Sequence, residues 1–82
     1  MEKIELKIIK PLKEEIIEVE WIEVQSPVGT FLVGPDHEPL VSQLKDRGIM
    51  KLKLLDGTEK NIETYGGIFK VENNKAIAIM ED

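Results

Sequence analysis

The chain has 82 residues, no cysteine, one histidine and a net charge of −5, from 16 acidic and 11 basic residues. Without cysteine there can be no disulfide, zinc–thiolate centre or thiol nucleophile, and a single imidazole excludes a multi-histidine metal site. The negative charge would repel a phosphate backbone, and no cluster of Lys and Arg with interleaved aromatic residues is present, so nucleic acid is not an expected partner.

A chain of this length is expected to form one domain, residues 1–82, with a thin core. No apolar run approaches the roughly 20 residues that span a bilayer. The first ten residues alternate charged and apolar side chains, which is unlike the continuous apolar region of a signal peptide. We therefore expect a soluble, intracellular protein, which can still be peripheral to a membrane complex.

Alternation of apolar and polar residues with a period of two dominates the chain and predicts β-strands. The first strand covers residues 3–8 and is closed by Pro11. Within residues 14–24 the apolar phase shifts by one position, which predicts a β-bulge near Trp21 and Ile22. Because Trp21 ends an apolar series, we expect it in the core, and the alternative is an exposed interface anchor.

The middle of the chain contains a turn and one helix-like segment. Residues 26–31 (SPVGTF) place Pro27 and Gly29 at turn-favoured positions, and an ordinary hairpin tip is the simplest interpretation. Residues 39–44 (PLVSQL) begin with a proline and space Leu40 and Leu44 four residues apart. They predict one helical turn at most.

Two hairpins are predicted in the second half of the chain. Asp56-Gly57 gives the turn signal within residues 49–65, and Asn73-Asn74 plays the same part between residues 68–71 and 75–80. Gly66-Gly67 leaves little room for a loop, which predicts a bulge or a strand bend where the chain crosses between sheets. Short strands with turns about every ten residues indicate a small antiparallel β-sandwich or barrel.

The only histidine lies in GPDHEP, residues 34–39, and raises the question of a catalytic or metal site. Adjacent residues on an extended loop point in different directions, so Asp36, His37 and Glu38 have poor geometry for general acid/base chemistry or for a metal ion. We expect no catalytic, metal or cofactor-binding residue. Pro35 and Pro39 fix φ and restrict the residues before them, so the segment is predicted to be a rigid connection that docks at little entropic cost.

Residues 31–44 (FLVGPDHEPLVSQL) resemble the Gly-x-x-Pro-Gly-His-x-Pro-Leu-Leu segment of the ε subunit of bacterial and chloroplast F-type ATP synthases. The matching positions are Pro35, His37, Pro39 and Leu40. Four further stretches are similar in the same order: residues 6–11, 19–24, 48–57 and 66–82. The resemblance covers nearly the whole chain and implies a flattened sandwich of about ten short strands in two sheets.

The resemblance implies a non-catalytic subunit of the central rotor, which couples proton- or ion-driven rotation to ATP synthesis. In the family this domain packs against the γ subunit and rests on the polar loops of the membrane c-ring, without entering the membrane. The implied location is the cytoplasmic side of the bacterial inner membrane, and no cofactor is implied. The implied contacts are, for γ, Pro35, His37, Pro39 and Leu40, and, for the c-ring, Gly29 and Thr30.

Two other functions stay open at this point. A stand-alone sandwich that binds a small molecule or peptide would have a concave apolar pocket, whereas a rotor subunit would have a flat exposed apolar patch. A small hydrolase using His37 would need ordered catalytic partners around its ring.

The chain also departs from the family pattern. Thr30 stands where an acidic residue is usual, and Asp36 replaces the glycine before the histidine, which aspartate tolerates because it enters the left-handed region readily. Residues 45–48 are one residue longer than the usual Lys-Pro-Gly. The family commonly continues beyond the equivalent of Asp82 into a two-helix hairpin, whose autoinhibitory contacts and ATP site cannot be assigned to these residues.

Overall fold

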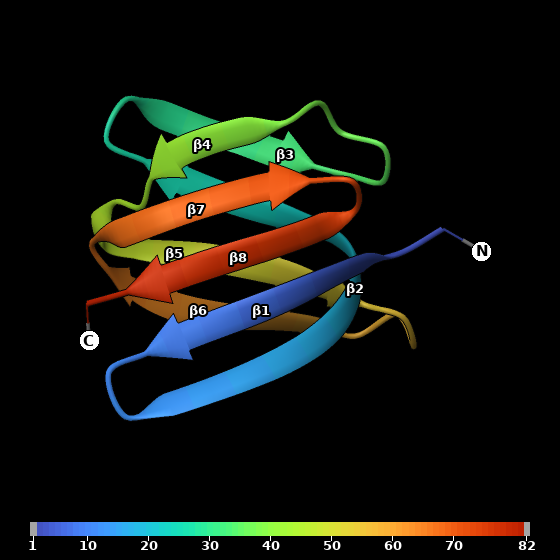
Figure 1. Cartoon of the computed structure of the whole chain (residues 1–82), viewed down its shortest axis with the longest axis horizontal. Coiled ribbons are helices and arrows are strands. Elements are labelled where there is room, and N and C mark those ends of the chain that lie inside the picture. The colour runs from blue at the N-terminus through green and yellow to red at the C-terminus, as the bar shows by residue number, and fades with distance from the viewer. Residues whose placement is uncertain (1, 82) are drawn as a thin grey trace.

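Eight β-strands form the computed structural model, which describes residues 2–81 (Figure 1). They are β1 (Ile4–Lys10), β2 (Lys13–Ser26), β3 (Gly29–Val33), β4 (Leu40–Gln43), β5 (Asp46–Leu54), β6 (Glu59–Tyr65), β7 (Gly67–Glu72) and β8 (Lys75–Met80). The predicted all-β class is confirmed. The number of strands is lower than the expected ten or so, because the 14-residue β2 runs through both layers as one strand.

The strands pair in the order β4-β7-β8-β1-β2-β5-β6, with β3 added to β2. β1 pairs with residues 13–19 of β2, whereas β3 and β5 pair with residues 19–26. The sheet therefore folds over at β2 into a β8 layer (β4, β7, β8, β1 and the start of β2) and a β5 layer (β3, the end of β2, β5 and β6), stacked in Figure 1. All of these pairs are antiparallel except the parallel pair of β1 and β8.

The predicted bulge in β2 is confirmed. The register against β5 shifts between Val19 and Trp21, which leaves Glu20 as the extra residue. The inward-facing residues of β2 include Val19 and start again at Ile22. Because the bulge comes directly before Trp21, the Trp21 side chain does not point inward with them. The prediction that Trp21 belongs to the core is therefore wrong: it is half-buried and lies outside the apolar cluster.

The core fills the space between the two layers. It is built from the inward residues of the alternating strands: Ile4, Leu6, Ile8, Val19, Ile22, Val24, Val33, Leu44, Met50, Leu52, Phe69, Val71, Ala76, Ala78 and Met80. Burying a Val, Leu, Ile, Phe or Met side chain contributes about 1.5–3 kcal/mol each, so nearly every inward position is needed for a domain of this size.

Residues 39–44 do not form the predicted helical turn. Residues 40–43 are strand β4, antiparallel to residues 68–71 of β7. The spacing of Leu40 and Leu44 did not distinguish the two structures, because residues four apart share a face in a strand as well as in a helix. Leu40 packs on the core and Leu44 is buried in it, so pairing with β7 prevails over a weak local preference.

The predicted turns are confirmed, and one departure from the family pattern has a structural explanation. Asn73 and Asn74 have φ of 53° and 61°, as a tight hairpin turn requires. At Gly66 the chain leaves β6, which pairs with β5, and enters β7, which pairs with β8 and β4. The extra residue in 45–48 is taken up by a register shift between Asp46 and Gly48, with Arg47 at φ 59°.

Candidate protein interface

The β3–β4 loop, residues 34–39, is held against the β7–β8 turn by a reciprocal pair of hydrogen bonds. The Asp36 backbone N–H donates to Asn74 Oδ1 at 2.6 Å, and Asn74 Nδ2 donates to Asp36 Oδ1 at 3.2 Å. Asp36 has φ 63°, the left-handed conformation expected where the family pattern has glycine. Together with two prolines, this contact keeps the loop in one shape.

His37 is half-buried within this loop. Its Nδ1 lies 2.7 Å from the carbonyl oxygen of Glu38, and since a carbonyl only accepts, the ring proton is on Nδ1. Nε2, the other ring nitrogen, is then left for a contact outside the loop. An open hollow of about 320 Å³ adjoins it, lined by Asp36, His37, Pro39, Asn73 and Asn74. The arrangement suits a polar contact with another protein.

The β2–β3 tip has a different construction. Ser26 Oγ donates to the Gly29 carbonyl at 2.8 Å and accepts from the Val28 N–H at 3.3 Å. Gly29 and Thr30 are exposed, and Val28 at the apex is 96% exposed. A hydrogen-bonded turn thus projects one apolar side chain into solvent.

These two loops lie at opposite ends of the long axis of the sandwich, the β2–β3 turn on the left and the β3–β4 loop on the right of Figure 1. The molecule measures 32 × 26 × 20 Å. The structure brings Pro35, His37 and Pro39 together and separates them from Gly29 and Thr30. Leu40 follows the loop but packs its side chain on the core, so its part is to anchor the loop.

Comparison with known proteins accounts for this combination of fold and loop. The family model described as "ATP synthase, Delta/Epsilon chain, beta-sandwich domain" matches residues 3–82. The chain belongs to this family. The suspected resemblance is therefore confirmed across the described strands, none of which is followed by a helix within residues 2–81.

Individual relatives of this delta/epsilon-type sandwich are ATP synthase epsilon chains. The protein from Chlorobium limicola is 41% identical over 54 residues, which cover 66% of this chain and 60% of the relative. The protein from Geotalea daltonii is 31% identical over 81 residues, covering 98% of this chain and 57% of the relative. The chain thus spans about three-fifths of the length of these relatives.

Two solved structures show the same fold at low sequence identity. The mitochondrial ATP synthase of Euglena gracilis, solved as an OSCP/F1/c-ring assembly, contains a chain with a TM-score of 0.92 and 20% identity, covering all of this chain and 52% of that one. The central stalk and c-ring of the Tetrahymena thermophila enzyme gives a TM-score of 0.80 at 16% identity, covering 98% and 64%.

Other site chemistry is sparse in the described part of the chain. Residues 2–81 contain no group of three or more His, Asp or Glu placed to hold a metal ion. Nor do they include a helix with the length and hydropathy needed to cross a bilayer.

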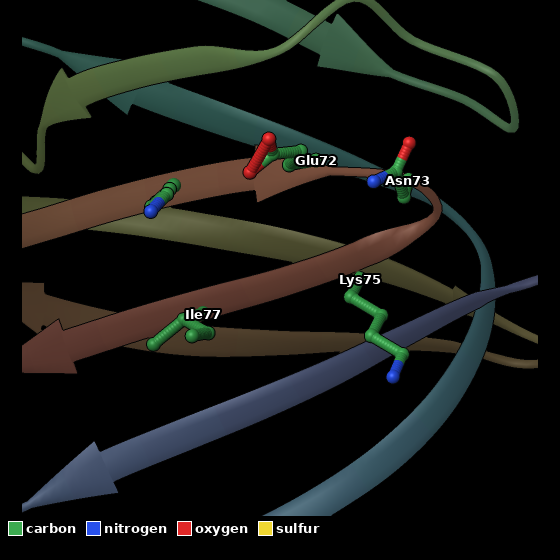
Figure 2. Close-up of a pocket in the computed structure, with 5 residues that line it drawn as sticks. Glu72, Asn73, Lys75 and Ile77 are labelled. Carbon is green, nitrogen blue, oxygen red and sulfur yellow. The ribbon is translucent and has the colours of Figure 1, made fainter.

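The outer face of β7, β8 and β1 is a further surface, which was not predicted from the sequence. Its strand β8 buries Ala76 and Ala78 and turns Ile77 and Ile79 outward. The alternation in residues 75–80 contained this signal, because the larger apolar residues occupy the phase opposite to the alanines. An open hollow of about 300 Å³ on this face is lined by Lys70, Glu72, Asn73, Lys75 and Ile77, and Figure 2 shows four of them labelled along the β7–β8 hairpin.

Proposed function

We propose that this chain is a non-catalytic central-stalk domain of an F-type ATP synthase, which docks on the γ subunit and on the polar loops of the c-ring and couples ion-driven rotation to ATP synthesis. In this role it would be peripheral to the membrane, on the cytoplasmic side of a bacterial inner membrane. The observation that carries the proposal is the match of residues 3–82 to the delta/epsilon sandwich family.

The construction of the molecule supports a mechanical role. Transmission of torque between two partners requires a stiff body with a contact at each end. The hydrogen-bonded sheet folds over a close-packed core, and within residues 2–81 no buried side-chain polar atom lacks a hydrogen-bond partner. The β3–β4 loop and the β2–β3 tip lie at opposite ends of this body (Figure 1).

The γ contact is proposed for Pro35, His37 and Pro39, with Leu40 anchoring the loop in the core. The contact between Asp36 and Asn74 preorganises the segment, so little conformational entropy is lost on docking. The c-ring contact is proposed for Gly29 and Thr30 at the exposed tip, where an uncharged threonine replaces the acidic residue usual in the family.

The stand-alone binding module is less well supported. The hollows near His37 and on the β7–β8 hairpin are open and lined mainly by charged and polar side chains. A hydrolase using His37 is likewise disfavoured, because Nδ1 is bonded to the Glu38 carbonyl rather than to a carboxylate that would orient a catalytic base.

The direct test is binding of the purified chain to the γ subunit and the c-ring of the same source. His37→Ala should weaken binding to γ about tenfold, and Thr30→Lys, whose charge is opposite to that of the acidic residue usual in the family, should weaken c-ring binding without affecting γ. Asn74→Ala should weaken γ binding less, because it frees the loop without removing a contact. Asn61→Ala, on the exposed face of β6, is the matched control and should change neither. Failure of the unaltered chain to bind either partner would refute the proposal.

A further inference from the structure

The outward residues of β7, β8 and β1 form a regular grid, because these neighbouring strands are in register. Each row crosses from β7 through β8 to β1. The three rows, from the end where β8 finishes, are Ile68, Ile79 and Ile9; Lys70, Ile77 and Lys7; and Glu72, Lys75 and Glu5. One row is wholly apolar, the next has an isoleucine between two lysines, and the last has a lysine between two glutamates.

The apolar part of this face is larger than single exposed residues would produce. Ile68 is 42% and Ile79 is 49% exposed. The middle row continues on both sides, to Val41 of β4 opposite Lys70 and to Ile16 of β2 opposite Lys7. Lys70 and Lys7 separate these two residues from Ile77, so the contiguous part of the patch is the row of three isoleucines together with Ile77. A contiguous apolar patch rimmed by charges marks a site of protein contact. The strand β8 also uses its small residues for the core, which leaves its large ones for a neighbour.

The dimensions of the grid fit one α-helix. Neighbouring strands lie about 4.8 Å apart, so β7, β8 and β1 together span about 10 Å, close to the diameter of a helix with its side chains. Successive rows are about 6.7 Å apart along the strands, slightly more than one helical turn of about 5.4 Å. A helix lying along β8 would therefore place its central stripe on Ile77 and Ile79. Successive turns of this helix would have a charged residue on each side, first Lys70 and Lys7 and then Glu72 and Glu5.

The charges indicate what the helix must carry. Although the chain has a net charge of −5, the middle row is basic. Among the ion pairs within residues 2–81, Lys70 has none, and Lys7 contacts Glu14 Oε1 at 3.0 Å in an exposed pair of the kind that holds its lysine only weakly. Carboxylates on the partner would find Lys70 and Lys7 on either side of the apolar stripe.

We propose that the outer face of β7, β8 and β1 docks an amphipathic α-helix of a partner protein. The helix lies along β8, with an apolar stripe on Ile77 and Ile79, acidic residues beside Lys70 and Lys7, and basic residues one turn further on beside Glu72 and Glu5. The hollow lined by Lys70, Glu72, Lys75 and Ile77 receives one of its side chains (Figure 2). This surface goes beyond the proposed function, since neither loop contact uses it.

A second copy of the chain fits this face less well. A two-fold axis parallel to β8 would set Lys70 over Lys7 and Glu72 over Glu5, so like charges would meet. A two-fold axis across the strands that pairs lysine with glutamate would move the isoleucine row out of contact. Like-charge juxtaposition and lost apolar contact both oppose self-association.

Two designed helical peptides of about 20 residues test the proposal. The first has a leucine stripe flanked by glutamates and, one turn on, by lysines, and the second has the glutamates and lysines exchanged. The first should shift amide NMR signals of β7, β8 and β1 and bind at least about tenfold more tightly than the second. Ile79→Glu should weaken it about tenfold or more, and Leu32→Glu, on the outer side of β3 in the β5 layer, is the matched control that should not.

A charge reversal separates docking from damage to the fold. The double variant Lys7→Glu with Lys70→Glu should prefer the charge-exchanged peptide over the first, which a merely unfolded protein cannot do. Equal affinity for both peptides, signal shifts confined to β5 and β6, or self-association that Ile79→Glu abolishes would each overturn the proposal. Because the peptides contain no γ sequence, the result is independent of the test of γ binding.

Discussion

The hairpins β5–β6 and β7–β8 are similar units that face water differently. The outward residues of β5–β6 in the paired rows from Ile49 to Lys53 are Ile49, Lys51, Lys53, Glu59, Asn61 and Glu63, followed by Tyr65 at the end of β6. They include one isoleucine and an ion pair between Lys51 and Glu59 at 3.8 Å. Those of β7–β8 are Ile68, Lys70, Glu72, Lys75, Ile77 and Ile79, which include three isoleucines. Both hairpins bury apolar residues on the inner face.

The difference shows in which layer folding alone removes most apolar side chains from water. The β5–β6 hairpin has one apolar and one solvated face, as an antiparallel sheet at the surface usually does. The β7–β8 hairpin lies inside its layer, between β4 and β1, and is apolar on both faces at one end. A strand pair with this pattern is typical of a sheet that is covered on both sides. Substitutions on the inner face of β7 should therefore change the stability of the fold, and substitutions on its outer face should change association with a partner.

The largest expected effect separates two neighbouring residues of β7. Phe69 is fully buried, and its ring meets Phe31 across the two layers in an edge-on contact, with centroids 6.2 Å apart. Phe69→Ala should lower the free energy of unfolding by about 3–5 kcal/mol, measured by urea denaturation. Ile68→Ala, one residue away on the outer face, should change it by less than about 0.5 kcal/mol.

A loss of that size can unfold a domain as small as this one. Phe69→Leu then serves as the milder variant, with a smaller loss in the same direction. If Ile68→Ala destabilised the isolated chain as much as Phe69→Ala, the outer face would be part of the folding core, and the contrast between the two faces of β7 would be lost.

The second effect concerns the junction between the two hairpins. Gly67 has φ 123°, and a Cβ there would lie 2.0 Å from the carbonyl oxygen of Ile79. Gly67→Ala should cost more than about 2 kcal/mol, because the strained backbone alone costs about 1–3 kcal/mol and the clash must also displace β8. Gly57→Ala is the control in the β5–β6 turn: its φ is 93°, but a Cβ there meets nothing within 4 Å.

Thermal unfolding of the two variants checks this expectation, together with amide exchange in β8. The loss of protection should be concentrated at the β7–β8 pair in Gly67→Ala and absent from it in Gly57→Ala. Equal destabilisation by both would show that backbone conformation alone, rather than the close approach of β8, requires glycine at position 67.

Much of the fold could be predicted because local signals agree with it. The alternation of β1, the phase shift in β2, the turns at Asp56-Gly57 and Asn73-Asn74 and the crossing at Gly66-Gly67 all depend on neighbouring residues, and each is confirmed. The errors came from positions that only tertiary contact decides. Residues 40–43 become a strand by pairing with residues 68–71 of β7, which come much later in the chain, with Leu40 opposite Val71 and Gln43 opposite Ile68.

The candidate interface divides in the same way. The rigidity of residues 34–39 follows from Pro35 and Pro39 and could be predicted, but the anchor that fixes Asp36 is Asn74, in a different hairpin. The outer face of β7, β8 and β1 was not found, because its rows exist only once three strands are placed side by side in register. The sequence shows the alternation within each strand, but which strands are neighbours is seen only in the folded structure.

The smallest effect distinguishes the turns of the two hairpins by pH. The pKa of the Asp56 carboxyl is lowered below its usual 3.8, first because the Thr58 hydroxyl donates to Oδ1 at 2.6 Å and then because the Thr58 N–H donates to it at 2.9 Å. A carboxyl whose pKa is lower in the folded state stabilises that state above its unfolded pKa, and this contribution is lost as the pH falls through the folded value. Asp56→Asn should therefore lower the urea midpoint at about pH 7, and its difference from the unaltered chain should shrink as the pH falls through the lowered pKa of the folded state, because the carboxyl then becomes protonated in both states. Asn73→Asp, placed in the turn of the other hairpin without a threonine two residues on, is the matched control. A difference between Asp56→Asn and the unaltered chain that persisted undiminished at the lowest pH would show that the carboxylate charge has no part in holding the β5–β6 turn.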